Sequence, residues 1–149
     1  MTKRMQMAAK RIEVTKENII KLESLRFKAY GDEEKLSGQT LYTIGLSMGT
    51  MIPYGFYVGE TIVAGCYISA HDDSLFVEQL FVHPNLQNTG LKAGWLLLSY
   101  VLSQKEEIEQ YFQTRFHKSP LEPFDTRARE IFEKIGYNQD DDVMVKKLV

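Results

Sequence analysis

The chain has 149 residues, of which 44% are hydrophobic and 26% are charged, and its formal net charge at pH 7 is −2. This length and composition are typical of one globular domain with a buried core, so we expect a single domain over residues 1–149. The slightly acidic balance argues against a dedicated nucleic-acid-binding protein, and the sequence has no apolar run long enough to span a bilayer.

The first third of the chain predicts a strand and a helix. Residues 10–14 fit a short strand, and Thr15 is placed to cap a helix that has Glu17 in its first turn. Gly31 ends this helix, and its buried stripe consists of Ile19, Leu22, Leu25 and Ala29. Residues 32–51 also show helical spacing, but several glycines weaken the helix prediction there.

The next segment predicts three consecutive antiparallel strands. Residues 54–58 and 62–70 are rich in β-branched and aromatic side chains and are joined through a turn at Gly59. The polar residues 71–74 form a second turn that leads into the next strand. Cys66 is expected to be a small buried residue of the second strand. Because it is the only cysteine and no signal-peptide pattern is present, we expect a reducing, cytoplasmic location.

Residues 75–82 form a strand that is apolar on both faces, which predicts a covered sheet with at least one parallel neighbour. Strict alternation groups Phe76, Leu80 and Val82 on one face and Leu75, Val77 and Phe81 on the other. Glu78 interrupts the run, and a buried carboxylate requires a partner, water or a function. A salt bridge, a water-exposed strand edge and a catalytic role are all open for Glu78.

A polar turn and an apolar helix follow this strand. Residues 85–89 are polar, Gly90 permits close approach of a ligand, and the apolar residues from Leu91 onward recur at helical spacing. A glycine-containing turn that opens a helix presents backbone N–H groups without partners at the positive end of the helix dipole. The segment therefore predicts an anion site that suits a phosphate or pyrophosphate.

Beyond the main helix, residues 111–116 are expected to form the next strand. This strand can lie parallel to residues 75–82 through a right-handed crossover, which leaves a splayed seam where a cofactor can enter. The other expected features are a frayed helix end over 103–110, a loop over 117–124, a helix capped by Asp125 and closed by Gly136, and a strand over 143–149.

Two short segments follow known patterns. Gln87-Asn88-Thr89-Gly90-Leu91-Lys92 fits Arg/Gln-x-x-Gly-x-Gly/Ala, except that Lys92 stands at the last position. Asp125, Ala128, Phe132 and the pair Gly136-Tyr137 follow Asn-x-x-Ala-x-x-x-Tyr-x-x-x-Gly-Phe with the spacing intact. These patterns, in this order, resemble the acetyl-CoA signatures of the GNAT superfamily of N-acetyltransferases. With the predicted strands, the resemblance covers most of the chain.

The resemblance implies a fold and an activity. The fold is α/β (α+β), with a central mixed, mostly antiparallel sheet, a splayed parallel strand pair and helices on both faces. The activity is transfer of an acetyl group from acetyl-CoA, as cosubstrate, to a primary amine of a small molecule or peptide by direct attack. The segment before residue 54 would shape the acceptor pocket. For its apolar residues, a core role is favoured over a substrate groove: Tyr42, Met48, Met51 and Tyr54.

Acyl transfer to an amine requires a base, a donor to the developing oxyanion and a leaving thiolate. Glu78 is the candidate base, because it lies one strand segment ahead of the anion loop. The resemblance places the oxyanion donor at a backbone N–H around Phe81 or Val82. Phe132 replaces a tyrosine that family members often have, so we expect water to protonate the thiolate, with Tyr111 or Tyr137 less favoured. The implied cofactor-binding residues are Phe81, Val82, Gln87, Asn88, Thr89, Gly90, Leu91, Lys92, Ala93, Asp125 and Phe132.

Three function classes stay open from the sequence. The preferred class is the amine acetyltransferase; the second is a non-catalytic acyl-CoA-binding domain, which Phe132 and Lys92 favour; the third is an unrelated nucleotide-binding or interacting α/β domain. The histidines and the single cysteine show no metal-ligand spacing, so we expect no metal. We also expect no nucleic-acid or membrane partner. The oligomeric state, a homodimer included, is open.

Overall fold

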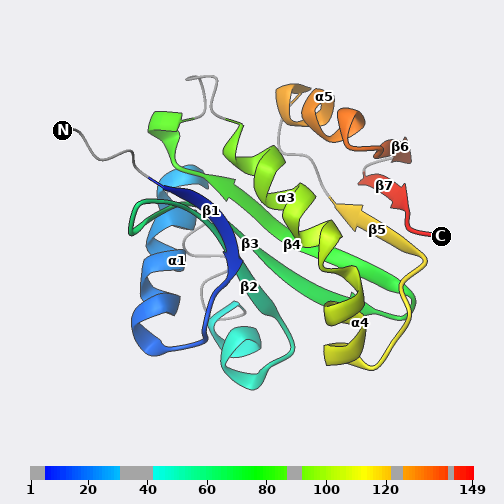
Figure 1. The fold of residues 1–149 in the computed structure, drawn as a ribbon, viewed down its shortest axis with the longest axis horizontal. Helices are drawn as coiled ribbons and strands as arrows, with labels where there is room; N and C mark the ends of the chain where they lie inside the picture. Colours follow the sequence, from blue (N-terminus) through cyan, green and yellow to red (C-terminus); the bar gives the residue numbers. More distant parts are fainter. Residues whose placement is uncertain (1–5, 31–41, 87–91, 122–125, 141–142) are drawn as a thin grey trace.

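The computed structural model describes residues 6–30, 42–86, 92–121, 126–140 and 143–149, which form a layered α/β structure (Figure 1). Seven strands in these residues form one sheet in the order β1-β2-β3-β4-β5-β7-β6. A helix over residues 42–48 is called helix 42–48 below. The other elements are β1 (Met7–Arg11), α1 (Lys16–Tyr30), β2 (Ile52–Val58), β3 (Thr61–His71), β4 (Ser74–Val82), the 3-10 helix η1 (Pro84–Leu86), α3 (Ala93–Ser103), α4 (Lys105–Phe112), β5 (Lys118–Leu121), α5 (Thr126–Lys134), β6 (Asn138–Asp140) and β7 (Val143–Lys147).

The sheet is mixed. Among the described strands, every neighbouring pair is antiparallel except β4 and β5, which run parallel. The chain connects β4 to β5 through α3 and α4, because parallel neighbours need a long crossover. The predicted α/β fold, with a mostly antiparallel sheet and one parallel pair among the described strands, is confirmed.

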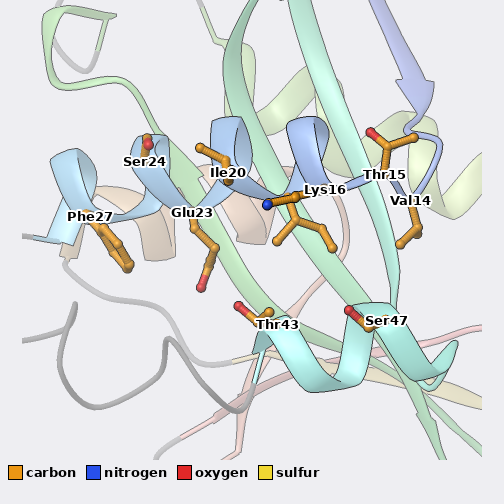
Figure 2. A pocket seen from close by; sticks show the side chains of 10 residues that line it. Val14, Thr15, Lys16, Ile20, Glu23, Ser24, Phe27, Thr43 and Ser47 are labelled. Atoms are coloured by element: carbon orange, nitrogen blue, oxygen red, sulfur yellow. The ribbon is translucent and has the colours of Figure 1, made fainter.

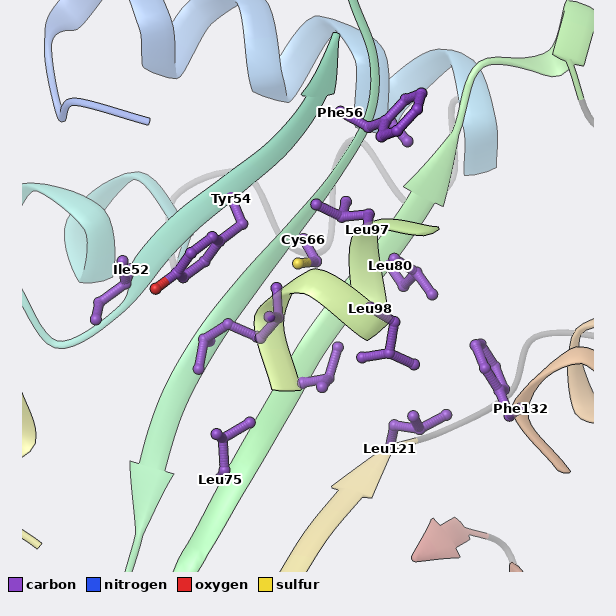
Figure 3. Close-up of a cluster of buried hydrophobic side chains, with 14 of the residues drawn as sticks. Ile52, Tyr54, Phe56, Cys66, Leu75, Leu80, Leu97, Leu98, Leu121 and Phe132 are labelled. Atoms are coloured by element: carbon purple, nitrogen blue, oxygen red, sulfur yellow. The ribbon is translucent and has the colours of Figure 1, made fainter. Parts of the chain in front are cut away.

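One face of the sheet is covered by α3. Leu97, Leu98 and Val101 of α3 are fully buried and pack with residues of β2, β3 and β4, and we call this cluster the α3-side core. Figure 3 shows Leu97 and Leu98 above the strands, near Cys66 and Leu80. Full burial of a leucine side chain stabilises the fold by about 1.5–3 kcal/mol. This packing holds α3 against the sheet.

The opposite face is covered by α1 and helix 42–48. Leu22 and Leu25 of α1 and Leu46 of helix 42–48 pack with Tyr67 of β3 and Phe81 of β4, and we call this cluster the α1-side core. The sheet is therefore covered on both faces, as the apolar strand over residues 75–82 predicts.

The core interpretation is confirmed for three of the four apolar residues weighed for a substrate groove. Tyr42 and Met51 are buried in the α1-side core, and Tyr54 is buried in the α3-side core. Burial raises the pKa of the Tyr54 hydroxyl to about 12. Met48 is 73% exposed and lies outside both cores.

The N-terminal helix begins where the sequence predicts it. The Asn18 backbone N–H donates to the Thr15 hydroxyl over 3.1 Å, so Thr15 caps α1. The strand predicted over residues 10–14 is wrong in its bounds, since β1 spans Met7–Arg11 and pairs with β2 along that length. The next residue, Ile12, is buried in the α1-side core, and its N–H donates to the Pro53 carbonyl of β2 over 3.0 Å.

The two predicted hairpins are confirmed. β2, β3 and β4 pair antiparallel in chain order, and the turns between them contain Gly59 and Asp72 at positive φ. Cys66 is fully buried in β3, as expected, and burial raises the pKa of its thiol.

The segment after α3 differs from the prediction. The sequence predicts a frayed helix end over residues 103–110 and a strand over residues 111–116, but α4 is a helix with Ile108 in the α3-side core. The Glu109 carboxylate accepts a hydrogen bond from the Phe116 N–H over 2.7 Å, and Lys105 lies 3.5 Å from it. Burial of Ile108 in the core, together with these local contacts, outweighs the strand propensity of the aromatic residues in this segment.

The parallel neighbour of β4 lies inside the segment predicted as a loop. β5 covers Lys118–Leu121 and pairs with β4 at Ser74–Lys118 and Val77–Leu121. Pro120 favours a loop in the sequence, because proline gives no hydrogen bond to a strand ladder. Gly136, with φ of 105°, closes α5 as expected, whereas the predicted cap Asp125 lies outside the described residues. The last predicted strand corresponds to β7.

Candidate functional site

β4 and β5 separate part-way along β4. Their last paired residues are Val77 and Leu121, whereas β4 continues to Val82. No strand among the described residues pairs with the β5-facing edge of residues 78–82. We call this edge the seam. Backbone groups that point to it belong to no strand ladder among the described residues.

Glu78 lies in a β-bulge of β4 at the start of the seam. β3 pairs Tyr67 with Gln79 and Ile68 with Val77, so Glu78 is an extra residue without a partner opposite it. Bulges bend a strand and redirect a side chain, and they are frequent beside active sites.

The bulge changes which side chains of β4 share a face. Leu75, Val77 and Leu80 all pack in the α3-side core, whereas Phe81 packs in the α1-side core. The sequence-based grouping is therefore wrong, because one extra residue shifts the alternation by one position. That grouping was Phe76, Leu80 and Val82 on one face and Leu75, Val77 and Phe81 on the other.

The Glu78 carboxylate is held by two side chains of β3. The Ser69 hydroxyl donates to Oε1 over 2.5 Å, and Nε2 of His71 lies 3.0 Å from the same oxygen. The Glu78 side chain is 22% exposed and that of His71 is 62% exposed. These polar partners and the partial contact with water explain how β4 accommodates a carboxylate.

The backbone at the end of β4 alternates between β3 and the seam. The His83 N–H donates to a carbonyl of β3 over 2.8 Å. In an antiparallel ladder this turns the Phe81 N–H toward β3 and the backbone groups of Leu80 and Val82 toward the seam. In agreement, the Leu80 carbonyl accepts a hydrogen bond from the Tyr30 hydroxyl over 2.6 Å. Of the two predicted oxyanion donors, Val82 is the one that faces the seam.

The N-terminus of α3 lies beside the end of β4. Gly94 permits this approach, since a Cβ at its position would lie 3.2 Å from Cγ2 of Val82. Lys92 precedes the helix and makes no side-chain capping hydrogen bond, and its Nζ lies 5.8 Å from the centre of the Trp95 ring. The Leu96 N–H donates to the Lys92 carbonyl over 2.9 Å. The N–H groups that precede Leu96 therefore have no acceptor within the helix.

The other predicted cofactor-binding residues divide into two groups. Ala93 begins α3 and is buried, and the side chains of Phe81 and Phe132 are also buried. Phe132 packs near Leu121 and lies 6.1 Å from Tyr137 between ring centres. The residues outside the described part of the chain are Gln87, Asn88, Thr89, Gly90, Leu91 and Asp125.

Both tyrosines considered as proton donors are hydrogen-bonded. Tyr111 donates to the Gly49 carbonyl over 2.8 Å, and the hydroxyl groups of Tyr137 and Ser119 lie 2.8 Å apart. Burial raises the pKa of the Tyr137 hydroxyl, and the hydrogen bond with Ser119 partly opposes this. Tyr111 is therefore committed to Gly49, and Tyr137 is neutral and buried.

A groove lies between α1 and helix 42–48 (Figure 2). Its volume is about 550 Å³. Figure 2 shows Ile20, Glu23 and Phe27 of α1 on one side and Thr43 and Ser47 of helix 42–48 on the other. The lining is mainly apolar, with several hydroxyl groups. The remaining lining residues are Val14, Thr15, Lys16, Ile19 and Ser24.

A buried ion pair connects this groove to the sheet. Arg26 donates from Nε and Nη2 to the Glu23 carboxylate over 2.8 and 3.2 Å, and the Tyr67 hydroxyl donates to it over 2.6 Å. Burial lowers the pKa of Arg26, but the hydrogen bond and charge of Glu23 outweigh burial and raise it. Burial, and then Glu23, raise the pKa of the Tyr67 hydroxyl. The ion pair therefore ties α1 to β3.

Two further observations concern metal ligands and membrane-spanning helices among the described residues. Within the described ranges, no three His, Cys, Asp or Glu side chains are grouped so that they could hold a metal ion. None of the helices in the same ranges has the length and apolar content that crossing a bilayer requires.

The sequence prediction missed Ser69 and His71. The hairpin pairs His71 with Ser74 and Ser69 with Phe76, and Glu78 is the next residue of β4 on that face. The spacing around the 71–74 turn is the signal that could have found them, because hairpin register follows from turn length.

No protein-family model and no curated protein sequence matches the chain. Solved structures match over almost its whole length. The ribosomal-protein-S18-alanine N-acetyltransferase of Escherichia coli has a TM-score of 0.75 at 12% identity, covering 96% of this chain and 94% of that one. The PaiA N-acetyltransferase of Thermoplasma acidophilum, in complex with coenzyme A, has a TM-score of 0.70 at 13% identity. The match covers 96% of this chain and 99% of that one. A GNAT family acetyltransferase of Brucella melitensis, in complex with acetyl-CoA, has a TM-score of 0.66 at 10% identity. The match covers 96% of this chain and 88% of that one.

Proposed function

The chain has the fold of the GNAT N-acetyltransferases, and from this premise we propose that it moves an acetyl group from acetyl-CoA to a primary amine of a small molecule or peptide. The observation that carries the proposal is a carboxylate, Glu78, in a bulge where β4 separates from β5. A carboxylate at this position is suited to accept a proton from a nucleophile that enters the seam.

In the proposed complex, acetyl-CoA binds where β4 ends and α3 begins. The described residues fit a diphosphate there, because Lys92 brings a positive charge to the N-terminus of α3 and makes no capping bond of its own. Gly94 lets α3 approach Val82 closely, which brings the helix N-terminus to the end of the seam. Residues 87–91, Lys92 and Ala93 hold the pyrophosphate in this proposal, and acetyl-CoA supplies the activated acyl group.

Glu78 is the proposed base. Its Oε1 is engaged by Ser69 and His71, while no described side chain donates to Oε2. Oε2 accepts the proton of the acceptor ammonium group, directly or through water, and the neutral amine attacks the thioester carbonyl carbon. The Val82 N–H, which faces the seam, donates to the developing oxyanion. The C–S bond then breaks, and water protonates the thiolate, since a thiol has a reference pKa of about 8.5.

The acceptor amine enters from the α1 side in this proposal. Glu78 contacts Ser69 on that face, and the groove between α1 and helix 42–48 also lies there. Phe27, which lines the groove, is followed along α1 by Tyr30, and Tyr30 bonds the Leu80 carbonyl beside the bulge. The α1 wall of the groove therefore continues toward the seam. Its mainly apolar lining suits an amine with an apolar body.

A non-catalytic acyl-CoA-binding domain is the second candidate. Phe132 occupies the position of the family's tyrosine, and its buried ring has no proton to donate. The neighbouring Tyr137 is engaged with Ser119. In this alternative the chain binds acetyl-CoA without turnover.

The test is thiol release from acetyl-CoA in the presence of a panel of primary amines, with the Glu78→Gln variant measured beside the wild type. We expect release with at least one amine and a fall in rate of about 10²- to 10⁴-fold in the variant. Calorimetric titration with CoA should give the same affinity for both proteins. CoA binding without release for any amine supports the non-catalytic candidate, and absence of CoA binding refutes both. An unchanged rate in Glu78→Gln excludes Glu78 as the base.

A further inference from the structure

Ser69 and His71 direct their side-chain contacts to one oxygen of Glu78. Oε1 is bonded by the Ser69 hydroxyl and lies 3.0 Å from Nε2 of His71, and Oε2 has no partner among the described residues. We propose that Ser69 and His71 are positioning residues, which hold the carboxylate in one orientation and leave Oε2 as its proton-accepting atom. This inference rests on the proposed role of Glu78 as base.

The sheet holds both donors rigidly. Ser69 and His71 are alternate residues of β3, so their side chains leave the same face of the sheet. The Ser69 residue is 5% exposed, which fixes the hydroxyl beside the bulge. The His71 ring packs edge-on against Phe76, with 5.4 Å between ring centres and 80° between ring planes. Phe76 therefore restrains the ring that reaches Glu78.

Holding Oε1 has a chemical consequence for Oε2. A hydrogen bond to a carboxylate oxygen stabilises its charge, so two donors on Oε1 make that atom the poorer proton acceptor. The two donors also oppose rotation of the long Glu78 side chain toward water. In an unrestrained glutamate this rotation costs little free energy. The incoming proton is thereby directed to Oε2. Loss of either donor should slow proton transfer and leave acetyl-CoA binding unchanged.

A purely structural role predicts a different result. An exposed ion pair contributes about 0–1 kcal/mol to stability. Removing a pair with only this role would not lower kcat selectively. Thermal stability and the split between kcat and KM therefore distinguish positioning from a structural contact.

The kinetic test uses two substitutions at His71. His71→Phe keeps a ring for the contact with Phe76 and removes the donor, whereas His71→Gln keeps a donor without the ring. We expect kcat to fall about tenfold in His71→Phe, because a hydrogen bond to a charged group is lost, and to recover in His71→Gln. The KM for the amine and the affinity for CoA should stay within about twofold of the wild type.

A matched control comes from the same end of the molecule. His117 is half exposed and lies 3.5 Å from Asp73, so His117→Phe also removes a histidine paired with a carboxylate. We expect its kcat to equal that of the wild type. Equal kcat in His71→Phe and the wild type, or equal losses in His71→Phe and His71→Gln, would overturn the proposal.

A second measurement does not depend on activity. Ring ¹⁵N shifts of His71, recorded in the full chain at a pH of about 8.5 where imidazole is largely neutral, report which nitrogen carries the proton. The proposal requires the proton on Nε2, facing Glu78, and a neutral ring protonated on Nδ1 overturns it. If no amine is acetylated while His71 carries its proton on Nε2, the proposed function fails and the contact that holds Oε1 stands.

Discussion

Removing one partner of the buried ion pair of α1 should greatly lower the free energy of unfolding. Replacing both charged residues by apolar ones should lower it much less. Arg26 is 0% exposed and Glu23 is 4% exposed. Arg26→Met keeps much of the side-chain volume but leaves the Glu23 carboxylate buried, with the Tyr67 hydroxyl as its remaining donor in the described part of the chain. An uncompensated buried charge of this kind costs about 3–5 kcal/mol. We therefore expect the single variant to be strongly destabilised.

The hydrogen bonds between Arg26 and Glu23 predict a similar loss of unfolding free energy. Arg26→Met removes the contacts of 2.8 and 3.2 Å to Glu23. Each hydrogen bond to a charged group contributes about 1.5–3 kcal/mol, so the two together contribute about 3–6 kcal/mol. In a domain of this size, each kcal/mol lowers Tm by about 2–4 °C, so a loss of about 3–5 kcal/mol lowers it by about 6–20 °C.

Removing both charges should restore most of the stability. The triple variant Glu23→Leu/Arg26→Met/Tyr67→Phe removes both charges of this pair, and Tyr67→Phe avoids leaving the Tyr67 hydroxyl buried without Glu23 as its acceptor. We expect its free energy of unfolding to lie within about 2 kcal/mol of the wild type, because apolar replacement of a buried ion pair is often neutral.

The assay is urea unfolding at pH 7, followed by circular dichroism with unchanged m-values. The matched control is Lys21→Met, since Lys21 and Glu17 form an exposed pair at 3.1 Å, and it should change stability by at most about 1 kcal/mol. The reasoning is refuted if Arg26→Met costs no more than Lys21→Met, or if the triple variant is as unstable as Arg26→Met.

Three further predictions concern packing and backbone. Leu97→Ala should lower the free energy of unfolding by about 2–5 kcal/mol because Leu97 is fully buried, whereas Leu96→Ala, at a residue 37% exposed, should cost much less in the same urea assay. Gly136→Ala should cost more than about 1 kcal/mol, since φ is 105°, a backbone conformation that residues with a Cβ rarely adopt; a stability equal to the wild type contradicts this. Cys66 should react with iodoacetamide only after unfolding in urea, because burial raises the pKa of its thiol; rapid labelling of the native protein would show that the thiol is accessible.

Local signals were sufficient for part of the fold. The Thr15 cap, the Gly59 turn and the two hairpins depend on residues close in the sequence, and the structure confirms each of them. These features follow from backbone preferences and capping chemistry that act within a few residues. An interpretation of the sequence can therefore place them without knowledge of the tertiary contacts.

The segment between α3 and β5 could not be placed in this way. Residues 111–116 include three aromatic side chains and favour a strand, but Ile108 is fully buried and the Tyr111 hydroxyl donates to the Gly49 carbonyl. The strand beside β4 is β5, which contains Pro120 and has a sequence typical of a loop. Both outcomes depend on contacts between distant segments, which propensity does not encode.

Glu78 shows how the same limit affects the candidate site. The sequence identifies Glu78 as a carboxylate within an apolar strand, where it requires a partner, water or a function. This expectation follows from the cost of burying a charge. Its position on the same face as Ser69 and His71 follows from the register of the 71–74 turn, whereas the extra residue in the ladder between β3 and β4, which strict alternation cannot predict, shifts the side chains that follow it. Removing the bulge would pair Glu78 directly with a residue of β3 and shift every later side chain of β4 to the other face. The bulge at Glu78 therefore sets which face Phe81 occupies and which backbone groups reach the seam, so the position of the proposed oxyanion donor depends on the backbone irregularity at which the proposed base lies.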